Sequence, residues 1–203
     1  RNGGSDRRWP AAYELSRLMG DPKVRADRTL APALVKAFEA AKDDDPRVRQ
    51  YLALAIGRLD PPLPPDAVAQ LTRALDATDG ESRVSAIWAL GSSGDPSAVA
   101  ALQPLAASPD KGIRKMVVYA LGALPGDAQI ATLCTALEDA EPDVRWNAAV
   151  ALSRKGRHDG VSILRQMLDR PYVEQQVKRD VRQDEDRDPI ADVLISGLRA
   201  AAT

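Results

Sequence analysis

Apolar residues recur along the chain at helical spacing, in segments of about 12 residues separated by turns rich in Gly, Pro and Asp. In residues 144–154, for example, Val144, Ala148, Ala151 and Leu152 fall on one side of a helical wheel. A second amphipathic segment precedes each of these helices. A single helix pair of this kind cannot bury its apolar face alone. The pattern therefore predicts helix–turn–helix units that stack on one another.

One short pattern repeats along the chain. Segments 8–17 and 145–154 share most of their ten residues, and three related segments lie between them. The repeated Arg falls at positions 8, 49, 83, 114 and 145, with spacings of 41, 34, 31 and 31. The preceding amphipathic segments are predicted at 32–42, 65–77, 96–107, 128–139 and 160–169. The extra residues in the longer spacings fall in turns, which a stacked array of repeats tolerates.

The repeated string resembles a known family. Residues 141–153, Glu-Pro-Asp-Val-Arg-Trp-Asn-Ala-Ala-Val-Ala-Leu-Ser, are similar to the HEAT repeat, in particular to its short phycobilisome-lyase-like subclass. The resemblance covers about residues 8–169. It implies an all-α, right-handed α–α superhelix, an α-solenoid of about five helix pairs with a C-terminal capping helix. It implies little about function, because such repeats serve many roles.

We expect one solenoid domain over residues 1–203. Within it we expect a mobile tail at 1–6, a charged insertion at 170–187 that forms a solvated helix or loop, and the capping helix at 188–201. A partner-binding arm is the alternative role for the charged insertion. Because the sequence starts at Arg1 without Met, we expect a trimmed or mature fragment, whose upstream residues could carry a signal or a membrane anchor.

Composition supports the helical interpretation. Hydrophobic residues make up 44% of the chain, but aromatic residues only 4%, and the apolar mass is mostly Ala, Leu and Val, of which Ala and Leu favour helices. The 28 Lys and Arg nearly balance the 29 Asp and Glu, so the whole chain has no charge excess that would attract nucleic acid or anionic membrane. No run approaches the roughly 18 apolar residues of a membrane span. We therefore expect no membrane insertion by this segment.

The aromatic residues follow the repeat. Four positions of each Arg-bearing helix lie opposite its packing face, and six of the seven Trp and Tyr residues fall on them. In HEAT arrays this helix lines the concave surface, so the resemblance implies an aromatic groove there. The predicted groove residues are Trp9, Tyr13, Arg17, Tyr51, Leu54, Arg58, Val84, Trp88, Lys115, Met116, Tyr119, Trp146, Asn147, Val150 and Arg154. As an alternative, these rings are spacers wedged between repeats or lie beneath a terminal tail.

Charge and ring chemistry suggest the partner. Trp and Tyr offer rigid contact area with a polar end and are enriched at binding hot spots. Arg17, Arg58, Lys115 and Arg154 are the charged groove residues, and all are basic. We therefore expect a protein or peptide partner with apolar and acidic groups. The separate, repeated Arg49, Arg83, Arg114 and Arg145 are interpreted as structural, binding the carbonyls and acids of adjacent turns as the resemblance implies.

Residues for catalysis or metal binding are scarce. His158 is the only histidine and Cys134 the only cysteine, so a metal site of several His ligands is excluded, as are the repeated His-Glu pairs of the iron hydroxylases with HEAT architecture. Cys134 lies among apolar residues and is interpreted as a buried, inert thiol. We find no Gly-rich phosphate loop. The sequence thus predicts a non-enzymatic binding scaffold without a cofactor.

Two other functions remain open at this point. HEAT-like DNA glycosylases suggest a solenoid that binds nucleic acid, since aromatic and Arg side chains can stack on bases and hold phosphates. The repeat subclass suggests a bilin lyase or chromophore chaperone. The oligomeric state is open as well, and a cytoplasmic location is the default expectation.

Overall fold

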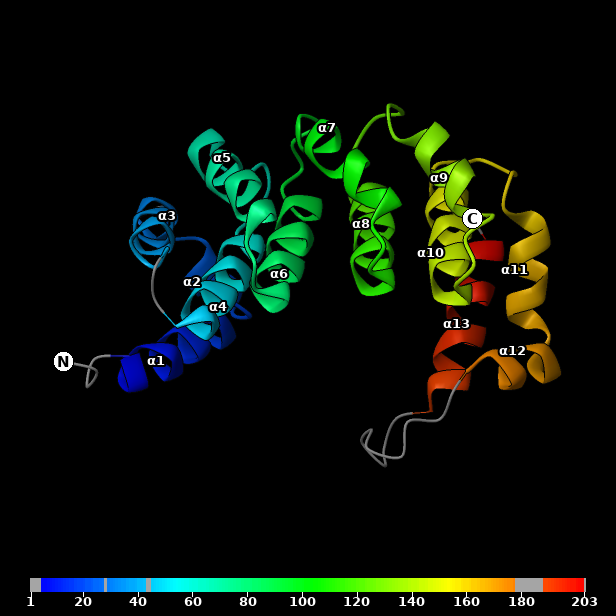
Figure 1. Ribbon diagram of the computed structural model, residues 1–203, viewed down its shortest axis with the longest axis horizontal. Coiled ribbons are helices and arrows are strands. Elements are labelled where there is room, and N and C mark those ends of the chain that lie inside the picture. Colours follow the sequence, from blue (N-terminus) through cyan, green and yellow to red (C-terminus); the bar gives the residue numbers. More distant parts are fainter. Residues whose placement is uncertain (1–4, 28, 43–44, 178–187, 203) are drawn as a thin grey trace. The chain divides into compact units, whose positions relative to one another are not determined.

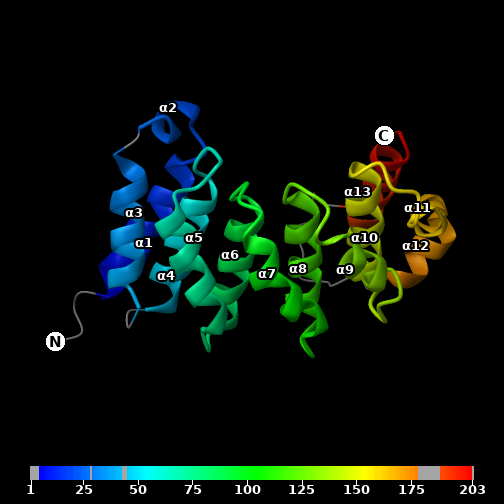
Figure 2. The same cartoon turned by 90° about the horizontal axis from the view of Figure 1, so that it is seen from above.

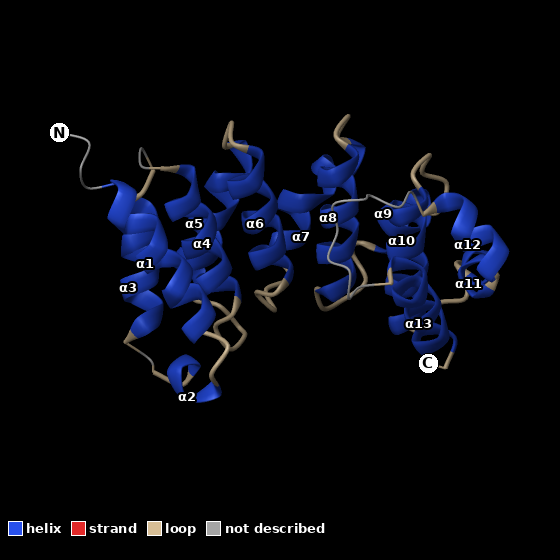
Figure 3. Cartoon of the chain, turned by 90° about the horizontal axis from the view of Figure 1, so that it is seen from below, coloured by secondary structure: helices blue, strands red, loops and turns tan. Residues whose placement is uncertain are grey.

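The computed structural model describes residues 5–27, 29–42, 45–177 and 188–202. Within these ranges the chain is helical and forms no β-strand (Figure 3). The helices that carry the repeated pattern are α1 (Ser5–Leu18), α4 (Pro46–Gly57), α6 (Gly80–Gly91), α8 (Lys111–Ala123) and α10 (Pro142–Arg154). The preceding segments form α3 (Leu30–Ala40), α5 (Pro65–Arg73) with the 3-10 turn η1 (Ala74–Asp76), α7 (Ala98–Leu102) with η2 (Gln103–Ala107), and α9 (Ile130–Ala136). The remaining helices are α2 (Pro22–Arg25), α11 (Val161–Leu168), α12 (Arg170–Gln176) and α13 (Pro189–Ala201).

The helix starts follow directly from the repeat sequence. Pro46 and Pro142 occupy first-turn positions of α4 and α10, where a proline lacks only a hydrogen bond that the helix would not make. Asp45 caps α4 by accepting from the backbone N–H of Arg47 at 2.9 Å. Asp79 caps α6 in the same way. The turn acids of the repeat are therefore helix caps.

The chain divides into two compact units. The N-terminal unit comprises residues 1–105 and 123–126, and the C-terminal unit comprises residues 106–122 and 127–203. Each unit contains its own layer of pattern-bearing helices and its own layer of preceding helices. The predicted site residues are divided between the two units: those up to Trp88 belong to the N-terminal unit and those from Lys115 onward to the C-terminal unit.

In the N-terminal unit, α4 lies side by side with both α1 and α6 (Figures 1 and 2). Leu52 and Ile56 of α4 and Ile87 of α6 are buried in the core between the layers. Gly57 allows the close approach of α4 and α6, because a Cβ there would lie 2.6 Å from Cζ3 of Trp88 and 2.8 Å from Cα of Ala89. The glycine that ends the repeated string thus serves helix packing.

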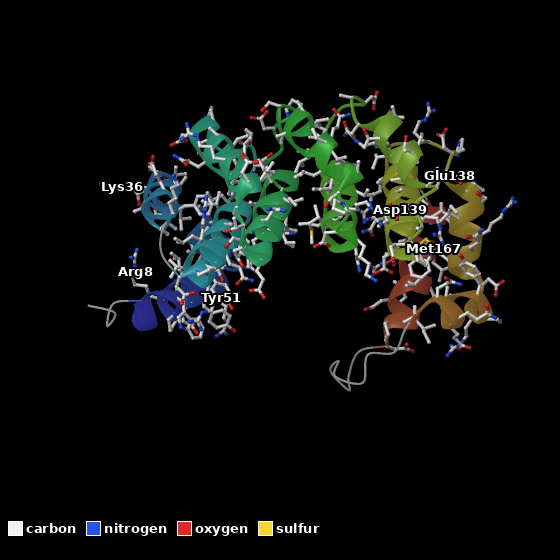
Figure 4. All side chains as sticks on the ribbon, viewed as in Figure 1. Arg8, Lys36, Tyr51, Glu138, Asp139 and Met167 are labelled. Atoms are coloured by element: carbon white, nitrogen blue, oxygen red, sulfur yellow. The ribbon has the colours of Figure 1, made fainter. Side chains whose placement is uncertain are left out.

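In the C-terminal unit, Val144, Ala148, Ala151 and Leu152 of α10 are all buried, which confirms the packing face expected from the helical wheel. α11 packs against α13, and Met167, labelled in Figure 4, is buried against Gly197 of α13. The predicted capping helix therefore also stands in the position of the second helix of a pair.

Two expected boundaries change. Residues 1–4 of the expected mobile tail lie outside the described residues. Residues 5 and 6, which were also expected to belong to this tail, are part of α1. In the expected charged insertion, residues 170–176 form α12, which packs against α11 and α13 and buries Val173 completely. A helix was one of the two forms expected here, but this helix is not fully solvated, because Val173 anchors it. Residues 178–187 of the insertion lie outside the described residues.

Candidate functional site

The repeated arginines bind the turn that precedes their own helix. Arg83 donates from Nε to the carbonyl oxygen of Ala77 at 3.0 Å. Arg114 donates from Nη1 to the carbonyl of Ser108 at 2.9 Å. Arg145 makes the equivalent bonds to its own turn from Nη1. Because each guanidinium satisfies turn carbonyls that would otherwise lack donors, these three arginines are structural, as expected.

One of these arginines also reaches the next repeat. Nε and Nη2 of Arg114 donate to the two carboxylate oxygens of Asp139 at 2.8 and 3.0 Å. Both side chains are mostly buried. The hydrogen bonds from Arg114 lower the pKa of the Asp139 carboxyl, against the opposing effect of burial. This ion pair forms a rung between successive turns within the C-terminal unit.

In the N-terminal unit, the predicted groove aromatics contact one another. The ring centroids of Trp9 and Tyr51 are 6.5 Å apart in a stacked arrangement, and those of Tyr13 and Tyr51 are 5.1 Å apart, edge to face. Tyr51 of α4 thereby joins both rings of α1; its position is labelled in Figure 4. The three rings act as a bridge between neighbouring helices.

Two arginines flank these rings. The guanidinium carbon of Arg47 lies 4.5 Å from the centroid of the Trp9 ring, and that of Arg17 lies 5.9 Å from the Tyr13 ring. Arg47 also pairs with Asp45 at 2.6 Å. Much of the Trp9 ring surface is therefore already in contact with this chain. Trp9 and Tyr51 are half-buried, whereas Tyr13 is 39% exposed and forms the open part of the cluster.

The other predicted residues of this unit also have contacts within the fold. Arg58 donates from Nη1 to the carbonyl oxygen of Ser16 at 2.6 Å and so caps the end of α1. Trp88 lies against Gly57 of α4 and is half-buried. Leu54 and Val84 are half-buried as well. For this unit, the alternative interpretation of the rings as spacers between repeats therefore describes most of the predicted residues.

The C-terminal unit brings the predicted residues around a pocket. This pocket has a volume of about 240 Å³ and lies among α8, α10 and α13. Six predicted groove residues line it: Lys115, Tyr119, Trp146, Asn147, Val150 and Arg154. Met116 belongs to the same helix as Lys115 but does not line the pocket and is half-buried. Six predicted residues of this unit thus lie around one pocket; that they bind a partner stays a prediction.

The exposure of the pocket residues is uneven. Tyr119 is 46% exposed and Arg154 is exposed, while Val150 and Asn147 are half-buried. Trp146 is only 5% exposed, so the expectation that its ring faces open solvent is wrong. The wheel positions of the five Arg-bearing helices left the space beside α10 open. In the structure, α13 packs against α10, and the indole fills the space between helices. Its Nε1 atom is buried without a hydrogen-bond acceptor among the described residues.

The charges of this pocket are mixed. Lys115 donates from Nζ to Oδ2 of Asp143 at 2.5 Å, and the amide of Asn147 donates to the carbonyl oxygen of Lys115 at 3.3 Å. Asp192 of α13 also lines the pocket. The expectation of a uniformly cationic surface is therefore wrong for this unit, since two carboxylates accompany Lys115 and Arg154.

The predicted set omits seven of the residues that line this pocket: Gly122, Asp143, Ala151, Met167, Asp192, Val193 and Ser196. Asp143 was overlooked because it precedes the wheel window, and Asp192, Val193 and Ser196 because α13 was treated only as a cap. A signal for the last three was present. Aligning the buried Ile190 with the buried Val144 places residues 192, 193 and 196 in register with 146, 147 and 150.

A larger cavity opens on the turn side of the N-terminal unit. Its volume is about 850 Å³, and Arg49, Arg73, Asp76 and Asp79 are among the residues that line it. The Arg49 guanidinium lies over Phe38, with its carbon 5.2 Å from the ring centroid. Both acidic and basic side chains line this cavity, and none of the predicted groove residues does.

Reactive groups are sparse in the described part of the chain. No cluster of three His, Cys, Asp or Glu side chains that could hold a metal ion occurs among these residues. Cys134 is half-buried, not buried as expected. Desolvation, followed by the nearby Asp159 carboxylate, raises the pKa of its thiol. His158 is exposed on a turn. No helix in the described ranges has the length and apolarity to cross a lipid bilayer.

Fold and surface together define an α-helical repeat scaffold. The sequence matches the family described as HEAT repeats over residues 31–117 and 102–183, and the chain therefore belongs to the HEAT-repeat family. The comparison with curated proteins found no match.

Three solved structures with a similar fold are designed or engineered. A designed armadillo repeat protein in complex with the peptide (KR)4 has a TM-score of 0.59 and 16% identity, covering 98% of this chain and 95% of that one. A second designed armadillo repeat protein has a TM-score of 0.60 and 18% identity, again over 98% and 95%. An engineered protein has a TM-score of 0.57 and 18% identity, over 99% and 92%. At these identities the similarity shows the fold, and it confirms the all-α repeat architecture.

Proposed function

We propose that this chain is a non-catalytic scaffold that binds a peptide or an extended segment of a protein, with its main contacts in the pocket of the C-terminal unit. The observation that carries the proposal is the convergence of Tyr119, Trp146 and Arg154 on one cavity. The exposed Tyr119 ring supplies contact area, the buried Trp146 indole forms part of the pocket wall, and Arg154 supplies donors for a partner's acceptor groups. In the N-terminal unit, the exposed Tyr13 and Arg17 offer a smaller surface of the same chemistry.

The armadillo neighbour supports this proposal in general terms only. It is a repeat protein of the same fold with a peptide bound. That peptide, (KR)4, is basic, whereas the pocket of this chain presents both Lys115 and Arg154 beside two carboxylates. We therefore infer a partner segment of different charge from the one that the designed protein binds.

The charge arrangement disfavours nucleic acid. Binding a phosphate backbone requires several cations that can exchange counterions for phosphates. Here Arg17 pairs with Glu14, Arg47 with Asp45 and Lys115 with Asp143. Local carboxylates thus offset many of the basic groups on these surfaces. A titration of oligonucleotide binding against salt tests this point, and we expect no binding even at low salt.

A selection experiment tests the proposal. The full chain is immobilised and used to select from a displayed library of random 12-residue peptides, with a helical repeat protein of unrelated surface as the reference. Enriched peptides are synthesised with a fluorescent label and titrated against wild type and against the double variant Tyr119→Ala, Arg154→Ala. We expect the double variant to weaken binding by about tenfold or more, since truncation of a hot spot costs 1–2 kcal/mol or more.

A matched control separates the pocket from the remaining surface. Leu168→Ala with Arg199→Ala also removes one large apolar and one basic side chain, both of them exposed and outside this pocket. The control should bind the selected peptides like wild type. Failure to enrich any peptide above the reference protein, or equal loss in both double variants, would refute the proposal.

A further inference from the structure

The pocket of the C-terminal unit contains a buried donor without an acceptor. Trp146 is 5% exposed, and its Nε1 has no hydrogen-bond partner among the described residues. Buried N–H groups are nearly always paired in folded proteins, since an unpaired one keeps its desolvation penalty. The indole also lines the pocket. An acceptor atom of a bound ligand could therefore supply the hydrogen-bond partner that Nε1 lacks.

A second donor stands at the other end of the pocket. Arg154 lies in the last turn of α10, is exposed, and forms no ion pair with the residues that the structure describes. The neighbouring basic residue Lys115 differs, since it is held by Asp143 at 2.5 Å. A guanidinium presents several donors in a fork that matches a carboxylate. Arg154 is therefore the cation of this pocket that is open to a ligand.

The carboxylates of the pocket lie at the opposite end from Arg154. Asp143 is in the first turn of α10 and Asp192 in the first turn of α13. Along α10, the 11 residues from Asp143 to Arg154 correspond to about 16 Å at the usual helical rise. The pocket thus has an acidic end and a basic end, with Val150 and Val193 also in its lining.

The volume limits what can enter. About 240 Å³ is below the roughly 300–1,000 Å³ typical of sites that enclose a whole small-molecule ligand. It suits one or two side chains of a longer peptide. Two carboxylates, Asp143 and Asp192, accompany Lys115 at the acidic end, which favours a neutral acceptor over Trp146 rather than a third carboxylate.

We propose that this pocket is a specificity subsite for an acidic side chain of the bound peptide. The carboxylate forms an ion pair with Arg154, an apolar part of the peptide covers Val150 and Val193, and a neutral carbonyl of the peptide accepts from Nε1 of Trp146. The inference rests on the proposed function and adds to it the charge and the direction of the bound segment.

Peptide pools test the charge preference. Four fluorescent pools of 8-residue peptides carry Glu, Gln, Leu or Lys at a fixed central position and random residues elsewhere, and each is titrated against the full chain. Wild type should bind the Glu pool about fivefold more tightly than the Gln pool, the scale of one accessible ion pair. The preference should disappear in Arg154→Gln and reverse toward the Lys pool in Arg154→Glu. Arg199→Glu, an exposed charge reversal on α13 outside the pocket, should keep the wild-type order.

The indole hydrogen bond has its own readout. The chain has three Trp residues, so the ¹H–¹⁵N spectrum shows few indole resonances, and Trp146→Phe identifies the one that belongs to Trp146. Saturation with the Glu pool should move that resonance downfield, as expected when the indole N–H gains an acceptor.

The outcomes separate the two proposals. Binding of the pools with no preference for Glu, or a Glu preference that survives Arg154→Glu, overturns the subsite while leaving peptide binding in place. An unmoved Trp146 resonance at saturation overturns the acceptor over the indole. Absence of binding by all four pools overturns the proposed function itself.

Discussion

The guanidinium of Arg114 and the carboxylate of Asp139 face each other with two hydrogen bonds of 2.8 and 3.0 Å. Asp139 also accepts from the backbone N–H of Glu141 at 2.9 Å, and its own carbonyl oxygen accepts from Arg145 at 2.6 Å. One aspartate therefore connects two repeated arginines and the start of α10. We therefore expect the stack within the C-terminal unit to depend on this residue.

Replacing Asp139 should destabilise the chain in a pH-dependent way. Asp139→Asn should lower the free energy of unfolding by about 1–3 kcal/mol near neutral pH, because it leaves the mostly buried Arg114 without its charge partner. The pKa of Asp139 is lowered in the folded state, so its stabilisation is complete above the unfolded value of about 3.9 and is lost as pH falls through the lower folded value. Denaturant unfolding from pH 7 down to pH 2.5 should therefore show wild type and variant converging below about pH 4. A constant difference across this range would contradict the assignment.

Adding a methyl group at Gly57 should destabilise the fold. A Cβ at this position would lie 2.6 Å from Trp88 Cζ3 and 2.8 Å from Ala89 Cα. Gly57→Ala should therefore lower the free energy of unfolding by about 1–3 kcal/mol, the range for overpacking, despite the better helix propensity of Ala. Gly80→Ala is the matched control, since a Cβ there meets nothing within 4 Å. Thermal unfolding should show a lower midpoint for the first variant and an equal or higher midpoint for the second.

The ring cluster of the N-terminal unit should stabilise α1. Tyr51 contacts both Trp9 and Tyr13, so Tyr51→Ala should cost about 1–3 kcal/mol of unfolding free energy. It should also increase cleavage within α1 under limited proteolysis, which maps local unfolding. Tyr119→Ala removes a ring that is 46% exposed and should change stability by less than about 0.5 kcal/mol. Equal effects of the two variants would show that the cluster does not anchor α1.

Cys134 should react slowly with thiol reagents. Burial and the Asp159 carboxylate raise the pKa of this thiol, and the thiolate is the reactive species. With an aromatic disulfide reagent at pH 8, the native chain should react more slowly than the same chain in denaturant. Asp159→Asn should increase the native rate, because it removes the negative charge that disfavours the thiolate. Native and denatured rates that agree would contradict this account.

Periodicity predicted the helices because stacking requires them. The apolar face of α10 is buried as expected: Val144, Ala148, Ala151 and Leu152 all have low exposure. A helix can remove such a face from water only by packing it against a neighbouring helix. The structural role of the repeated Arg was also predictable. In three repeats the Arg binds the carbonyl of the residue six positions before it, in the preceding turn.

The exposure of the rings was harder to predict. A helical wheel places a side chain relative to its own helix, but burial depends on the neighbouring helix, which the wheel does not contain. Trp88 is half-buried because it lies against Gly57, and Trp146 is buried in the layer that α13 extends. The charge of the pocket was misjudged for two reasons: Asp192 comes from another helix, and Asp143 lies on α10 just before the residues placed on the wheel.

Hydrogen exchange with a selected peptide tests the central claim most directly. Backbone amide exchange of the full chain is measured by mass spectrometry with and without a saturating peptide from the display selection. The account predicts slower exchange in segments 115–122, 143–154 and 190–197, which line the pocket of the C-terminal unit. Protection confined to segments 39–49 and 70–82, around the turn-side cavity, would contradict it.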